Sequence, residues 1–278
     1  MTDQQKRARL REILTSPKGA IAPGVTDGLF ARLAQDCGYA AVHLSGNAVH
    51  KNFCLPDRNL VTVTQVAQRA AQISEATEIP LIVDGGPACV DSLALARTVK
   101  FYERAGAAAI RFEDGLLNEY GAPPEELAIA PTDLMVDRIK AATDARRDQA
   151  LVLIARCDSR PNESLAQVLD RLAAYGDAGA DAVGVQLSDA EDFRGIGANS
   201  PAPLVSMWPR PLMTAFDFVQ LGFRIALMPS SVPLAALTAA REMLLQLQQT
   251  GRDRDYFAQQ TEFSRTDRWY KNLGTHRK

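Results

Sequence analysis

Carboxylates, arginines and small polar residues follow short apolar runs at several places in this sequence. In residues 104–114, RAGAAAIRFED, a glycine precedes an apolar run that ends at Glu113 and Asp114. The same order recurs in CGYAAVHLS at 37–45, AGADAVGVQL at 178–187 and LGFRIALMPS at 221–230. Each segment has the pattern of a helix end, a glycine stop and a buried strand. The sequence therefore predicts polar groups gathered at strand ends.

Two of these strand-end acids suggest a divalent cation. Asp84 and Glu113 end two successive predicted strands, and Mg2+ is bound in proteins by a few hard oxygen ligands while it keeps several waters. We assign both carboxylates to a metal site, with Mn2+ as a substitute ion. The alternative is that they cap the next helices or pair with Arg104 and Arg111.

The remaining strand ends predict contacts with an anionic substrate. Arg156 ends the next strand and has the donor geometry that clamps a carboxylate, although it can equally pair with Asp158. The tripeptide at 45–47 offers backbone N–H groups to an anion, or is a plain turn. His43 alternates with apolar neighbours, which favours a core histidine over a catalyst. The predicted substrate-binding residues are Ser45, Gly46, Asn47, Arg156, Gln186 and Ser230.

Eight apolar segments that alternate with helical patterns must position these groups. The predicted strands are 19–22, 41–44, 79–83, 107–112, 151–155, 182–185, 204–207 and 225–228. This alternation predicts a parallel α/β sheet, and eight strands close into a (β/α)8 TIM barrel with active-site residues at the C-terminal strand ends. An open doubly wound sheet is the alternative, but no GxGxxG or GxxxxGK[ST] motif follows a strand. We expect one barrel domain over 1–250 and a helical extension over 251–278.

The amino-acid composition and net charge limit the kinds of molecule that this protein is expected to bind. The 278 residues are 46% hydrophobic, and 31 basic against 33 acidic residues give a net charge of -2. No basic excess recommends a nucleic acid or an anionic membrane. The charged N-terminus lacks a signal-peptide core, and no run is long enough to span a membrane. We expect a cytoplasmic protein that binds a small molecule.

Over nearly its whole length the chain resembles the isocitrate lyase and phosphoenolpyruvate mutase superfamily, which includes 2-methylisocitrate lyases and oxaloacetate decarboxylases. The matching pieces are APGVTDGLFARLAQDCGYAAVHLSG (22–46), LPDRN (55–59), IPLIVDGG (79–86), ARTVKFYERAGAAAIRFED (96–114), MVDRIKAATDAR (135–146), LIARCDS (153–159) and YGDAGADAV (175–183). The resemblance implies a barrel with Mg2+ at its mouth, a 2-oxo or 2-hydroxy acid and an enolate-like intermediate. It also implies a homotetramer that exchanges a C-terminal helix, here within 253–273.

Carried over by position, the resemblance gives each residue a role. Ser45 and Gly46 would hold the substrate carboxylate and oxyanion, and Arg156 would clamp a carboxylate. Asp57 would order the metal waters and a mobile loop. The implied metal shell contains the carboxylates of Asp84 and Glu113.

Two departures from the family pattern shape the predicted reaction. The metal strand usually ends Asp-x-Asp, whereas here Gly86 replaces the second acid, which should weaken Mg2+ binding. The lyases carry a Lys-Lys/Arg-Cys-Gly-His loop, whereas residues 115–121 read GLLNEYG. Residues 116–132 are long enough for a functional lid.

These features predict a Mg2+-assisted carbon–carbon lyase acting on a small 2-oxo or 2-hydroxy (di)carboxylic acid, with decarboxylation favoured. That reaction needs a cation at the enolate oxygen and no loop cysteine. Glu119 or Tyr120 would later protonate the enolate. The alternatives are a hydrolase of a C–C or C–P bond, and a barrel that binds a small acid without catalysis or without metal.

Overall fold

A computed structural model of the chain describes residues 1–56, 60–85, 91–116, 128–160, 162–187, 189–207, 213–260 and 263–273. The chain divides into two compact units, Met1–Val232 and Pro233–Lys278. The predicted boundary near residue 250 remains a prediction.

The first unit is built on one eight-stranded parallel sheet, whose strand order is β1-β8-β7-β6-β5-β4-β3-β2. The sheet is closed by a parallel bridge between Gly24 and His43, where the Val25 N–H donates to the His43 carbonyl at 2.9 Å. The strands are β1 (Ala20–Pro23), β2 (Val42–Leu44), β3 (Leu81–Asp84), β4 (Ala109–Glu113), β5 (Val152–Cys157), β6 (Ala182–Val185), β7 (Leu204–Met207) and β8 (Phe223–Met228). The predicted (β/α)8 barrel is confirmed, and the open-sheet alternative is wrong.

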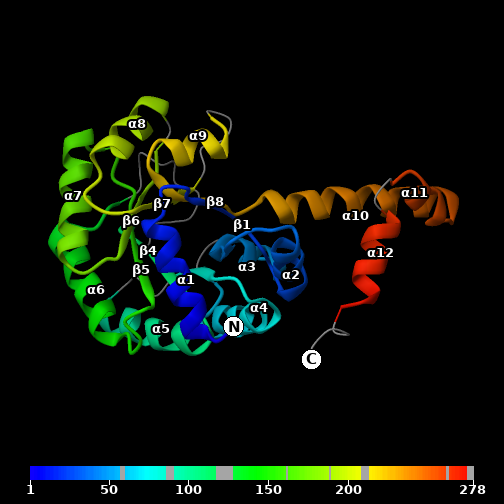
Figure 1. The fold of residues 1–278 in the computed structure, drawn as a ribbon, viewed down its shortest axis with the longest axis horizontal. Helices are drawn as coiled ribbons and strands as arrows, with labels where there is room; N and C mark the ends of the chain where they lie inside the picture. Colours follow the sequence, from blue (N-terminus) through cyan, green and yellow to red (C-terminus); the bar gives the residue numbers. More distant parts are fainter. Residues whose placement is uncertain are drawn as a thin grey trace. The chain divides into compact units, whose positions relative to one another are not determined.

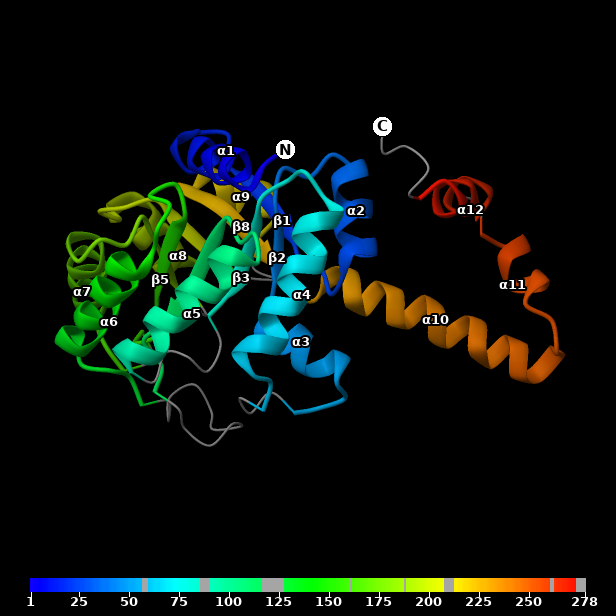
Figure 2. The ribbon, with the colours of Figure 1, turned by 90° about the horizontal axis from the view of Figure 1, so that it is seen from below.

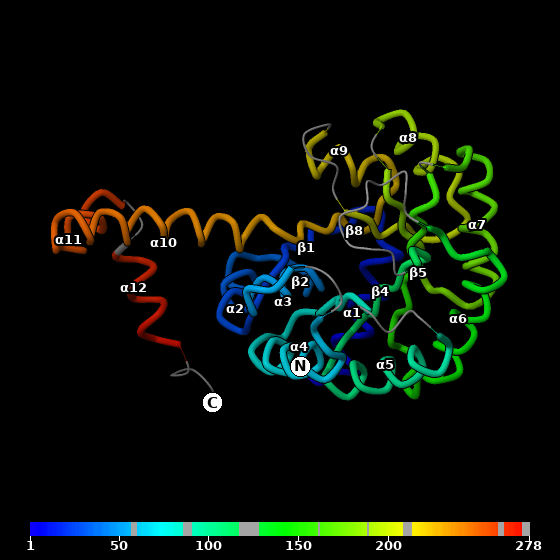
Figure 3. Tube along the Cα trace, turned by 180° about the vertical axis from the view of Figure 1, so that it is seen from behind, coloured from blue at the N-terminus to red at the C-terminus, as the bar shows by residue number. Residues whose placement is uncertain are grey.

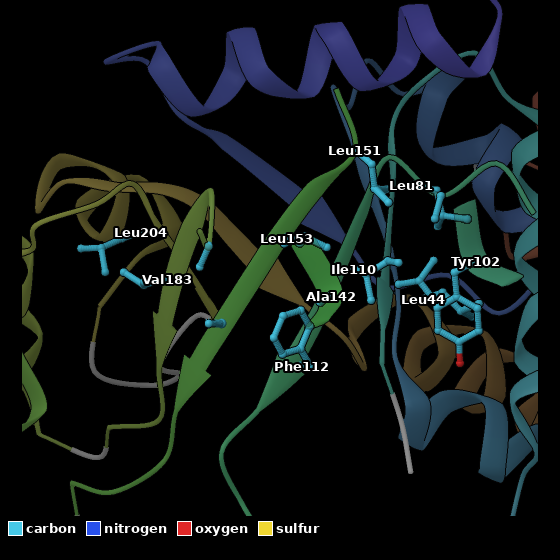
Figure 4. Packing of buried hydrophobic residues seen from close by; sticks show 14 of the residues in the cluster. Leu44, Leu81, Tyr102, Ile110, Phe112, Ala142, Leu151, Leu153, Val183 and Leu204 are labelled. Carbon is cyan, nitrogen blue, oxygen red and sulfur yellow. The ribbon is translucent and has the colours of Figure 1, made fainter. Parts of the chain in front are cut away.

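Helices surround the strands of this unit (Figures 1 and 3). They are α1 (Asp3–Thr15), α2 (Gly28–Asp36), α3 (Gly46–Asn52), α4 (Val63–Ala76), α5 (Ser92–Arg104), α6 (Thr132–Ala145), α7 (Leu165–Asp177), α8 (Ala190–Asn199) and α9 (Ala215–Gln220). Because side chains of a strand alternate between its two faces, every second one packs outward on the helices. Figure 4 shows this layer, in which Leu81 and Ile110 of the strands lie beside Tyr102 of α5.

The other strand positions point into the barrel, and α1 closes the barrel at its N-terminal end. Leu10 and Leu14 of α1 pack in the same cluster as inward residues such as Ile82, Ala109 and Ile154. The Arg7 Nε donates to the carbonyl of residue 107, just before β4, at 3.0 Å. Figure 2 shows α1 across this end. The C-terminal strand ends therefore form the open mouth, where barrel enzymes carry their reacting groups.

The second unit is helical. The long helix α10 (Ser231–Thr250) leads into it, and α11 (Arg254–Ala258) and α12 (Phe263–Lys271) follow. Within the range 251–278, the described residues form these two short helices. None of the helices described here has the length and apolar character needed to cross a membrane.

Candidate active site

The register of three neighbouring strands lines up the predicted site residues. Asp84 of β3 is the lateral partner of Arg111 on β4, and Glu113 is the partner of Arg156 on β5. Arg111 and Glu113 are two positions apart, so both point into the barrel and Glu113 lies one layer nearer the mouth. Two carboxylates and two guanidinium groups therefore form adjacent pairs inside the barrel.

The deeper pair is built around the Asp84 carboxylate. Its Oδ1 accepts from the Arg111 Nε at 2.7 Å and lies 2.9 Å from the His43 Nε2. Its Oδ2 accepts from the Gly46 N–H at 3.1 Å. Burial raises the pKa of Asp84, but the Arg111 and His43 partners outweigh it and hold that pKa well below its usual value. Asp84 is therefore an ionised carboxylate with both oxygens engaged.

Arg111 has donor capacity that this pair does not use. Its side chain is only 6% exposed, yet its Nη1 is buried without a hydrogen-bond partner among the described residues. An unpaired buried donor is costly and uncommon in folded proteins. Among the described residues, this buried guanidinium nitrogen therefore has no acceptor.

The outer pair is built around Arg156. Its Nε donates to Asp158 Oδ1 at 2.5 Å, its Nη1 lies 3.0 Å from Glu113 Oε2 and its Nη2 donates to Gln186 Oε1 at 3.0 Å. Burial disfavours the charged form, but the Asp158 and Glu113 carboxylates outweigh it and raise the pKa of Arg156. The Glu113 side chain is 46% exposed and is the partner that a substrate carboxylate can most easily replace.

A buried acid supports the backbone behind Arg156. Asp114 is fully buried, accepts the Asp158 N–H at 2.8 Å and accepts the Tyr175 hydroxyl at 2.7 Å. Burial raises the pKa of Asp114, against the hydrogen bonds from Tyr175 and Asp158. Burial also raises the pKa of Asp158, against the opposing charge of Arg156. This network fixes the segment that carries the Arg156 side chain.

The structure shows the ion pairs that the sequence offered as alternatives to metal binding and to substrate binding. Asp84 pairs with Arg111, and Arg156 pairs with Asp158, as well as with Glu113. Arg104 lies on α5 and is exposed, so it is not the partner of either acid. From the sequence, Arg111 is expected only as an ion-pair partner and His43 only as a core residue. Their position in phase with Glu113 and Ser45, two residues further along the same strands, was the available signal.

The predicted substrate-binding residues differ in burial and in hydrogen-bond partners. Ser45 is buried and precedes α3, so the plain-turn interpretation of 45–47 is wrong. The Gly46 N–H is already donated to Asp84, while Asn47 and Ser230 are exposed. Gln186 contacts Arg156. The remaining predicted positions lie outside the described residues, namely Asp57, Gly86, Glu119 and Tyr120.

The described side chains do not fit a Mg2+ site as they stand. Asp84 accepts from Arg111, His43 and Gly46, and Glu113 pairs with Arg156. Within the described ranges, no group of three His, Cys, Asp or Glu side chains is arranged to hold a metal ion. A cation bound to Asp84 Oδ1 would meet the positive charge of Arg111 at contact distance.

Comparisons with known proteins agree with the barrel fold. The profile of the phosphoenolpyruvate phosphomutase family matches residues 10–248. A 2-methylisocitrate lyase of Aeropyrum pernix is 32% identical over 273 residues, which cover 96% of this chain and 87% of the lyase. The structure of an oxaloacetate acetylhydrolase with its product oxalate has a TM-score of 0.80 and 27% identity, covering 90% of this chain and 89% of its own. A phosphonopyruvate hydrolase with oxalate and Mg++ has a TM-score of 0.82, 25% identity and full coverage of both chains, 100% and 100%.

Proposed function

Because the chain belongs to the phosphoenolpyruvate phosphomutase family, we propose that it is a carbon–carbon lyase acting on a small 2-oxo or 2-hydroxy (di)carboxylic acid. The observation that carries this proposal is Arg156. It is an inward-facing guanidinium at the mouth, and its partner Glu113 is half exposed and replaceable. A planar guanidinium binds a carboxylate through two parallel hydrogen bonds. A substrate carboxylate that replaces Glu113 would keep the charge balance of Arg156.

The proposed substrate pose uses the residues around this guanidinium. Gln186 already contacts the Arg156 Nη2 and would orient it. We keep the other strand-end groups as proposed substrate contacts, namely Ser45, Gly46, Asn47 and Ser230. Asp57 is proposed to order the segment over 116–132.

The favoured reaction is decarboxylation of a 2-oxo dicarboxylic acid. The bond between C3 and its carboxylate breaks, CO2 leaves, and the electron pair enters the enolate of the remaining 2-oxo acid. A proton then adds to C3, and we propose Glu119 or Tyr120 as its donor. The barrier falls when positive groups face the enolate oxygen, and a guanidinium at the mouth supplies such a group.

Mg2+ or Mn2+ at Asp84 and Glu113 stays a prediction for this chain. The related phosphonopyruvate hydrolase was solved with Mg++ and oxalate. Here the contacts of both carboxylates disfavour the ion. The proposed reaction therefore relies on the side chains of the chain itself.

A hydrolase is the second candidate. The oxaloacetate acetylhydrolase and phosphonopyruvate hydrolase structures, which resemble this barrel at TM-scores of 0.80 and 0.82, favour cleavage of a C–C or C–P bond by water. A barrel that only binds a small acid is the outcome expected if no substrate is consumed.

We also propose that the protein is a cytoplasmic homotetramer that exchanges C-terminal helices. Two observations support it: residues 233–278 form a unit of their own, and α10 has no buried side chain. Light scattering coupled to gel filtration tests the assembly, and a monomer at micromolar concentration would contradict it.

The function is tested with a panel of acids suggested by the relatives: oxaloacetate, 2-methylisocitrate, 2,3-dimethylmalate and phosphonopyruvate. Proton and phosphorus NMR follow substrate loss and product formation beside enzyme-free controls. We expect at least one acid to be consumed above background and the rate to fall by at least about 100-fold in Arg156→Ala. No consumption of any acid would contradict a catalytic role on this panel.

A further inference from the structure

A positively charged side chain, that of Arg111, lies against Asp84 inside the barrel. In this structure Asp84 Oδ1 accepts from the Arg111 Nε at 2.7 Å and also lies 2.9 Å from the His43 Nε2. The register places the two residues side by side on β3 and β4. A guanidinium thus contacts one oxygen of the carboxylate that the sequence assigns to a metal ion.

The Arg111 guanidinium is held in place and is not saturated. Its Nε is fixed by Asp84, and Asp84 is fixed in turn by His43 and the Gly46 N–H. The Nη1 is buried and has no hydrogen-bond partner within the described part of the chain. A buried donor that the protein leaves unpaired points to an acceptor atom brought by a ligand.

Arg111 and Arg156 are two guanidinium groups on neighbouring strands that an anion at the mouth could contact. Arg111 lies one layer below Glu113, whose lateral partner is Arg156. Asp84 pairs with Arg111, while Arg156 pairs with both Glu113 and Asp158. An acid that replaces Glu113 would therefore meet two guanidinium groups, at two depths of the same mouth.

We propose that the Arg111 guanidinium takes the place of the divalent cation, so that acid binding by this chain is independent of metal. Its free N–H donates to the 2-oxo oxygen of the substrate, while Arg156 binds the carboxylate. Asp84 and His43 are positioning residues for Arg111. The inference rests on the proposed function only for the class of ligand, a 2-oxo acid or its enolate.

Oxalate is the probe, because it carries adjacent carboxylate oxygens like the enolate of a 2-oxo acid. Titration calorimetry on chelator-treated wild-type protein is run in EDTA, and again with EDTA replaced by excess Mg2+ or Mn2+. We expect oxalate to bind in EDTA, with a Kd that changes less than about twofold when metal is present. Binding that appears only with metal would overturn the inference, and so would the absence of oxalate binding under every condition.

Variants test the role of the guanidinium itself. Arg111→Met leaves Asp84 short of a partner, so it is combined with Asp84→Asn to avoid an unpaired buried charge. We expect the double variant to bind oxalate in EDTA at least about tenfold more weakly, while Arg104→Met, the same change on exposed α5, leaves Kd unchanged. Circular dichroism confirms folding before titration. A folded double variant with wild-type Kd in EDTA would contradict the role of Arg111.

The inference and the proposed function fail in different ways. Oxalate binding in EDTA without consumption of any panel acid would retain the guanidinium site and reject the lyase. Consumption that requires added metal would retain the enzyme and reject Arg111 as the cation. The wild-type titration needs no variant, so it decides even if the Arg111→Met/Asp84→Asn double variant fails to fold.

Discussion

Tyr175→Phe should measurably weaken the network behind Arg156. The Tyr175 side chain is fully buried, and its hydroxyl donates to the fully buried Asp114 at 2.7 Å. Phenylalanine keeps the ring and its packing, so the change removes the hydroxyl alone. A hydrogen bond to a charged group contributes about 1.5–3 kcal/mol, and we expect a loss of about 2 kcal/mol in the free energy of unfolding. For a unit of this size that is a fall of roughly 4–8 °C in Tm.

The assay is urea unfolding followed by circular dichroism at neutral pH, with a parallel thermal scan. Tyr39→Phe is the matched control, because Tyr39 belongs to the same unit and is exposed. The midpoint should fall for Tyr175→Phe at unchanged slope and stay within error for Tyr39→Phe. Equal midpoints for the two variants would refute the view that Tyr175 satisfies a buried carboxylate.

Three further predictions follow from the contacts. Gly24→Ala should abolish soluble expression or lower Tm by well over 5 °C, because a Cβ there would lie 2.1 Å from the Pro229 carbonyl oxygen; wild-type Tm would contradict this. Arg156→Lys, which keeps the charge but loses the planar fork, should weaken oxalate binding at least about tenfold by calorimetry, and an unchanged Kd would reject the clamp. The Arg171 donors lower the pKa of Glu163 from 4.5, so its ionised form stabilises the fold above that pH and the effect is lost as pH falls through the lowered value. Glu163→Gln should therefore lower Tm at pH 7 and converge with wild type in acid, and a constant difference down to pH 2 would contradict the assignment.

The strands were predictable because each is a short, mostly apolar run between helical patterns, and several of these runs follow a glycine. All eight predicted runs overlap observed strands, and the runs at 182–185 and 204–207 match β6 and β7 at both ends. The turn predicted at 45–47 was wrong, because Gly46 and Asn47 begin the helix α3. The residues Ser-Gly-Asn are common both in tight turns and at helix starts. Residue type alone therefore did not distinguish a turn from the first turn of a helix.

The site was harder to predict than the barrel. The sequence placed Asp84, Glu113 and Arg156 at strand ends, but pairing depends on lateral register, which single-strand patterns do not contain. The register sets Arg111 beside Asp84 and leaves Glu113 to Arg156. The distinction between a metal-ligating and an ion-paired carboxylate therefore required the neighbouring strand.

We propose that this family member acts on a small 2-oxo or 2-hydroxy acid with its own guanidinium groups in place of a metal ion. The most direct test is the turnover of the active panel acid by metal-stripped protein, measured in EDTA and in excess Mg2+, with the metal-catalysed background subtracted. We predict the same rate above background in both solutions. A rate that falls to background in EDTA and returns with Mg2+ would contradict the claim.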